Sequence, residues 1–77
     1  MKVFVQIIDT ITGIYQTGMI DENVVKGKEI ENALLHFGVH EREMTWLNTC
    51  NVNNVCTKFG QIEGTSKIVN AITITHL

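Results

Sequence analysis

Four side chains in this sequence are of the types that ligate metal ions: His36, His40, Cys50 and Cys56. Two histidines four residues apart, together with two thiols, are similar to the ligand set of a structural zinc site. Histidines with this spacing share one helix face only where the helix continues through both, and Gly38 is expected to end the helix between them. We therefore predict no metal site and no cofactor, with both histidines at the surface.

The two thiols are also candidates for nucleophilic chemistry or for a disulfide. With Asn53-Asn54 as a two-residue turn, Cys50 and Cys56 point to opposite faces of a hairpin. A five-residue loop would instead place them opposite each other, where they could bind a metal or form a disulfide. Cys56 shares its face with Lys58, which gives the electropositive setting of a reactive thiol. Nothing supplies the base and oxyanion donors of a nucleophilic site, so we predict no catalytic residue and no enzyme activity.

Most of the acidic residues occur in pairs: Asp21 and Glu22, Glu29 and Glu31, Glu41 and Glu43. General acid–base catalysis needs two carboxyl groups that face one cleft in different environments. These pairs fall in turns or on the polar face of a helix, so a solvated surface is the expected reading. Glu29, Glu31, Glu41 and Glu43 together form an acidic surface that could bind a basic protein partner.

Three further side chains are candidate binding residues: Tyr15, Asn48 and Asn70. Tyr15 lies on the first expected hairpin, where an exposed ring can anchor a protein interface. Asn48 and Asn70 lie within expected strands, and a buried amide must find a hydrogen-bond partner. The two amides either satisfy backbone groups or line a small polar pocket at an oligomer interface.

Hydrophobic periodicity predicts the elements that position these residues. Apolar runs at 2–8 and 14–20 flank turn residues and predict a β-hairpin, with 2–8 as a central strand. Apolar spacings of three and four predict a helix over 26–37. The remaining apolar segments predict strands at 44–50, 55–62 and 67–77. We therefore predict a single α+β domain over residues 1–77, with one helix packed on an antiparallel sheet in the order ββαβββ.

The clearest boundary is the end of the helix. Gly38 is expected in the left-handed conformation that follows a helix, with Val39 next, placed to contact Leu34 in a Schellman motif. The start is less well specified, because Asn23 could cap the helix but Gly27 weakens its first turn.

The hairpin around Asn53-Asn54 is expected to have a tight type I′ turn, because asparagine tolerates positive φ. In that register Cys50 lies opposite Thr57 and Val52 opposite Val55. Side chains that alternate along paired strands share a face, and this face is expected to meet the helix. Its predicted members are Met44, Trp46, Cys50, Val52, Val55 and Phe59.

Composition narrows the range of partners. The chain has 77 residues, 44% hydrophobic and 18% charged, with a net charge of −2, which favours a folded domain with a small core. Its six basic residues are scattered, so nucleic acid is not an expected partner. Neither a signal peptide nor an apolar stretch of about 20 residues is evident, so we expect no membrane partner and a cytoplasmic location.

These patterns favour binding over catalysis. We predict a small non-enzymatic protein-interaction module, a regulator or inhibitor that binds a larger protein partner. The alternative is a small-ligand-binding homo-oligomer with a polar pocket between subunits. Self-association is expected because no proline blocks a sheet edge and residues 68–75 carry no charge. The last strand, or another edge strand, would pair with a second chain.

Overall fold

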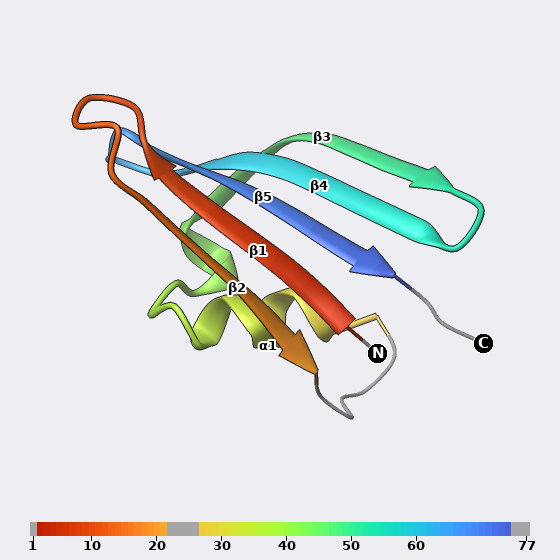
Figure 1. The fold of residues 1–77 in the computed structure, drawn as a ribbon. Coiled ribbons are helices and arrows are strands. Elements are labelled where there is room, and N and C mark those ends of the chain that lie inside the picture. The colour runs from red at the N-terminus through yellow and green to blue at the C-terminus, as the bar shows by residue number, and fades with distance from the viewer. Residues whose placement is uncertain (1, 22–26, 75–77) are drawn as a thin grey trace.

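The computed structural model describes residues 2–21 and 27–74, which form a five-stranded sheet with one α-helix against one of its faces (Figure 1). In chain order the elements are β1 (Lys2–Asp9), β2 (Tyr15–Asp21), α1 (Glu29–Leu35), a 3-10 helix η1 (Glu41–Glu43), β3 (Met44–Val52), β4 (Val55–Ile62) and β5 (Lys67–Ile74). The α+β class is confirmed. The order differs in detail from ββαβββ because η1 lies between the helix and the third strand.

The strands are arranged β2-β1-β5-β4-β3, and all neighbours are antiparallel. The hairpin β1–β2 and the meander β3–β4–β5 are therefore joined by the pairing of β1 with β5. The central position predicted for residues 2–8 is confirmed. The prediction of the last strand as a free edge is wrong, because β5 lies between β1 and β4, and the edges are β2 and β3. The absence of charge from residues 68–74 suits a strand with neighbours on both sides, because charged side chains are one of the features that protect an exposed edge.

The core lies between the sheet and α1. Along β1 and β5 alternate side chains point toward the helix and are buried, and in the helix the buried residues are Ile30, Ala33 and Leu34. The buried apolar residues are Val3, Val5, Ile7, Ile30, Ala33, Leu34, Val39, Met44, Ile62, Val69 and Ala71. Leu34 has no exposed surface at all. The apolar surface of the helix and the apolar surface of this side of the sheet therefore bury each other.

The predicted end of the helix is confirmed. Gly38 has φ +75°, and its N–H donates to the carbonyl of Leu35 at 3.0 Å. The N–H of Val39 donates to the carbonyl of Leu34 at 3.1 Å, which completes the Schellman pattern. The helix begins at Glu29, later than predicted, and the proposed cap Asn23 lies outside the described residues.

The register of the β3–β4 hairpin is confirmed near its turn, where Cys50 lies opposite Thr57 and Val52 opposite Val55. Asn53 has φ +55°, and it is the one non-glycine residue with positive φ among those described. The turn is therefore not type I′, which needs positive φ at both central residues.

The face predicted for this hairpin is wrong beyond Trp46. The register shifts between Trp46 and Asn48, so Leu47 is an extra residue that forms a β-bulge. Met44 and Trp46 lie on the helix side, as predicted. One inserted residue reverses the facing of everything after it, so Cys50, Val52, Val55 and Phe59 lie on the opposite face.

Asp9 organises the turn between β1 and β2. Its Oδ1 accepts hydrogen bonds from the N–H of Ile11 at 2.9 Å, the N–H of Thr12 at 3.3 Å and the hydroxyl of Ser66 at 2.9 Å. Hydrogen bonds to a carboxylate favour its charged form. The bond from Ile11, then those from Ser66 and Thr12, hold the pKa of Asp9 below its ordinary value, and Lys67 adds to this lowering.

We expect this lowered pKa to make the fold less stable in acid. A carboxylate with a depressed pKa stabilises the folded state above the pKa of the unfolded chain, about 3.9, and this contribution is lost as the pH falls through the folded value. Asp9→Asn should therefore lower the urea midpoint at pH 6 and have a smaller effect at pH 3. Ser66→Ala, which removes one of the three bonds, should reproduce part of this difference. Equal losses for Asp9→Asn at both pH values would contradict the assignment.

Candidate interaction face

The sheet has one covered face and one open face. We call the side opposite α1 the outer face, and no described element lies over it (Figure 1). The strand registers place twenty side chains on it, four from each strand. They are Tyr15, Thr17, Met19 and Asp21; Lys2, Phe4, Gln6 and Ile8; Ile68, Asn70, Ile72 and Ile74; Val55, Thr57, Phe59 and Gln61; Thr45, Asn48, Cys50 and Val52.

The outer face carries almost no charge. The chain has fourteen charged residues at neutral pH, eight acidic and six basic, and two of them, Lys2 and Asp21, lie on this face. They are register partners at the end of the β1–β2 pair, at one corner of the sheet. Their charges are opposite, so the face is neutral as a whole.

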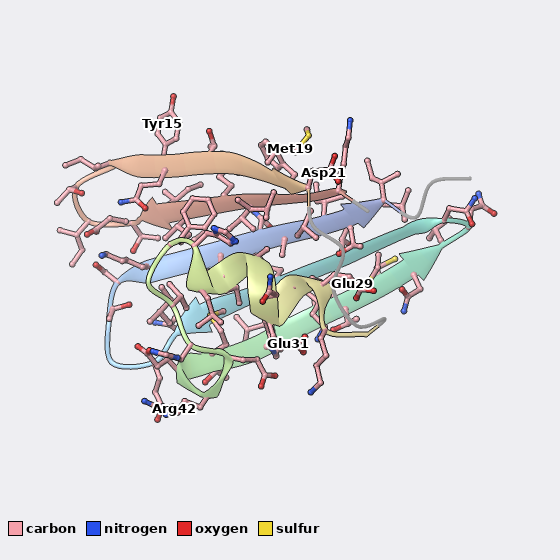
Figure 2. All side chains as sticks on the ribbon, turned by 90° about the horizontal axis from the view of Figure 1, so that it is seen from below. Tyr15, Met19, Asp21, Glu29, Glu31 and Arg42 are labelled. Atoms are coloured by element: carbon pink, nitrogen blue, oxygen red, sulfur yellow. The ribbon has the colours of Figure 1, made fainter. Side chains whose placement is uncertain are left out.

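Half of the twenty side chains are apolar, and several are well exposed. Met19 and Tyr15 are 60% and 64% exposed, and Ile74 and Phe4 are 44% and 36% exposed. Figure 2 shows Tyr15 and Met19 along the edge strand β2. The solvated face of an antiparallel sheet normally carries polar residues at its outward positions. Large exposed apolar patches are a common feature of surfaces through which proteins associate.

Register pairing divides the face into rows that cross all five strands. We name three of them by their chemistry or by their residue on β1. The polar row is Thr17, Gln6, Asn70, Phe59 and Asn48. The Phe4 row is Met19, Phe4, Ile72, Thr57 and Cys50. The Ile8 row is Tyr15, Ile8, Ile68, Gln61 and Thr45. The polar row lies in the middle, with the other two on either side.

Three of the predicted binding residues lie on the outer face, although Tyr15 and Asn48 are at its opposite edges, on β2 and β3. Asn70 and Asn48 lie in the polar row on either side of Phe59, and Tyr15 lies in the Ile8 row at the β2 edge. Asn48 is exposed and Asn70 half-buried. The two amides therefore do not line a closed pocket within one chain.

No family model, curated protein or solved structure matches this chain.

The four predicted glutamates lie away from the outer face. Figure 2 shows Glu29 and Glu31 beside α1. Glu29 accepts the N–H of Gly27 at 2.9 and 3.0 Å through its two oxygens. Glu43 accepts the N–H of His40 at 3.2 Å. Glu31 is half-buried and Glu41 is exposed, so two of the four carboxylates are engaged in local backbone contacts.

The predicted zinc residues lie at separate places. His36 ends α1 and His40 precedes η1, and Cys50 and Cys56 are free thiols on opposite faces of the β3–β4 hairpin. Across residues 2–21 and 27–74, no three His, Cys, Asp or Glu side chains are grouped closely enough to hold a metal ion.

Cys56 and Lys58 share one face of β4, as predicted, but this is the helix side, whereas the prediction put them on the side away from the helix. The ammonium group of Lys58 lies 5.0 Å from the centre of the Trp46 ring, a cation–π distance. Cys50, predicted as a buried core thiol, is exposed on the outer face because of the bulge at Leu47.

A cavity of about 290 Å³ lies on the helix side, where the end of α1 approaches the β1–β2 turn. Its walls are Ile7, Asp9, Thr12, Ile14, Gln16, Phe37, Val39, Ile62 and Lys67. None of the predicted binding residues lines it. Four of the nine wall residues are polar or charged (Asp9, Thr12, Gln16 and Lys67), and Oδ1 of Asp9 is already hydrogen-bonded within the turn.

Within the described residues, no helix has both the length and the apolar character to cross a membrane.

Proposed function

We propose that this chain is a small non-enzymatic protein-interaction module, a regulator or inhibitor that docks on a larger protein through its outer face. The observation that carries this proposal is the near absence of charge from twenty neighbouring side chains of which half are apolar. The folded chain keeps this surface in water at a free-energy cost, and a partner that covers it removes that cost.

The face also defines the chemistry of its partner. An uncharged apolar surface gains most from a second surface of the same kind, because a charge buried against it would lose its hydration without finding an opposite charge. The polar row supplies amide and hydroxyl groups that can hydrogen-bond across the interface and so orient the two proteins. The partner surface is therefore apolar and uncharged, with a few hydrogen-bonding groups.

Changing Phe4 should test this function. Phe4→Lys places a charge within the Phe4 row, beside Ile72, and we expect it to weaken partner binding at least about 10-fold, because a charge buried in an apolar interface loses its hydration without gaining a partner. The partner would be captured from the source organism with tagged protein, identified, purified and titrated calorimetrically.

Two matched controls separate the outer face from other surfaces. Ile11 is 82% exposed in the β1–β2 turn, and Ile11→Lys adds the same charge away from the face. Glu41→Lys reverses a charge on the acidic surface. Both variants should bind like the unmodified chain. Loss of binding with Glu41→Lys but not with Phe4→Lys would instead assign docking to the glutamates.

A further inference from the structure

We propose that a second copy of this chain occupies the outer face when no larger partner is bound, giving a face-to-face dimer. The two outer faces would pack about 10 Å apart, as in a β-sandwich. The α1 helix of each subunit would then lie on the side of its sheet away from the interface. The proposal rests on the proposed function, because it takes the outer face as a docking surface. It adds that self-association and partner binding are mutually exclusive.

The charge distribution suits a second copy. A surface that meets its own copy brings each charge near a like charge unless the charges are absent or lie at the rim, and like charges facing each other oppose association. The outer face has two charged residues, Lys2 and Asp21, and both lie at one corner. The centre of the face can therefore be buried against itself with no charge inside.

The area of the face is sufficient. Five strands at about 4.8 Å spacing and seven residues at about 3.3 Å each give a flat footprint of roughly 550 Å² per chain. Two such faces give roughly 1,100 Å² before the relief of the side chains is counted, which passes the threshold of about 1,000 Å² for a specific interface.

The rows are complementary under a two-fold rotation. An axis that runs along the polar row, between the two sheets, lays that row on its own copy and the Phe4 row on the Ile8 row of the partner. Phe4 then faces Ile8 of the partner subunit, and Ile72 faces Ile68 of the partner subunit. On β4 the same operation brings Thr57 near Gln61 of the partner subunit. Apolar groups therefore meet apolar groups, and polar groups meet polar groups.

The first test is the solution mass of the full chain at about 100 μM, by sedimentation equilibrium. We expect a dimer, twice the chain mass of 8.7 kDa. Ile72→Lys should weaken dimerisation by about 100-fold or more, because it brings two ammonium groups into the interface. Ile11→Lys, with the same added charge in an exposed turn, should leave the dimer intact.

The second test locates the interface and does not depend on how Ile72→Lys folds. Asn70 lies in the polar row on the central strand β5, so it is close to the two-fold axis. Asn70→Cys, in a chain that also carries Cys50→Ser and Cys56→Ala, should form a covalent dimer with a bismaleimide that spans about 10 Å. The matched variant Glu63→Cys, in the turn after β4, should not.

The outcomes separate the two proposals. A monomer at 100 μM would overturn the dimer and leave docking on a larger protein standing. A dimer that resists Ile72→Lys and shows no cross-link through Asn70→Cys would place self-association at an edge strand and would also overturn it. A face-to-face dimer whose larger partner still binds Phe4→Lys normally would support the dimer and contradict the proposed function.

Discussion

Replacing Leu34 by alanine is expected to lower the free energy of unfolding by about 2–5 kcal/mol, the range for large-to-small changes in a core. Leu34 is fully buried and belongs to the core that the helix forms with the apolar side chains of β1 and β5. A domain of this size has a small core, so the cavity left by three missing carbon atoms removes a large share of its stability. Urea unfolding followed by far-UV circular dichroism measures the change.

The adjacent residue is a matched control. Leu35 is 51% exposed, and Leu35→Ala should change the unfolding free energy by no more than about 0.5 kcal/mol, as is usual at surface positions. Both variants are compared with the unmodified chain at one protein concentration, because any self-association makes stability depend on concentration. Equal losses at the two positions would show that α1 does not pack on the sheet through the stripe described here.

The helix face, the helix end and the register of the β3–β4 hairpin could be predicted from short stretches of sequence. The spacing of Ile30, Ala33 and Leu34 identified the helix face, and Gly38 identified its end, because a left-handed residue after a helix depends on few distant contacts. The Asn53-Asn54 turn predicted the hairpin register in the same way. These features depend mainly on residues that are close together in the sequence.

The features that were missed depend on how distant segments meet. The segment 44–52 alternates well enough for a regular strand, and nothing in it marks Leu47 as an extra residue. The bulge follows from matching β3 to β4 on both sides of the Trp46–Gly60 pair. The central position of β5 depends on its pairing with β1, far away in the sequence.

The candidate site was visible in part. Tyr15, Asn48 and Asn70 were selected, and they lie on one face, but the apolar residues that give this face its character were assigned elsewhere. Cys50, Val52, Val55 and Phe59 were assigned to the core. A signal did exist, because apolar residues occur on both faces of β1 and β5 while one helix can cover only one face. Two sheet faces with apolar residues and a single helix would have pointed to the second face as the candidate interaction surface.

The second large effect is expected at Gly60 on β4. Gly60 has extended backbone, so alanine suits its dihedral angles, and replacing glycine there would ordinarily add about 0.4–1 kcal/mol of stability. The Cβ atom would lie 2.6 Å from the carbonyl oxygen of Thr45 and 2.9 Å from Cε3 of Trp46. The first of these atoms belongs to the backbone of the neighbouring strand and cannot move aside alone. We therefore expect Gly60→Ala to destabilise the fold by about 1–3 kcal/mol.

A second readout shows whether this close contact is the cause. Trp46 is the one tryptophan of the chain, so its fluorescence and near-UV circular dichroism report on the ring that lies over Gly60. Both signals should change in folded Gly60→Ala, because the ring must shift. Gly18→Ala is the matched control: its Cβ would lie 2.8 Å from the tip of the Phe37 ring, a side chain beside an edge strand that can rotate away. The control should stay within about 0.5 kcal/mol of the unmodified chain. A stabilised Gly60→Ala with unchanged tryptophan signals would show that β3 and β4 do not approach each other as closely as the bulged register requires.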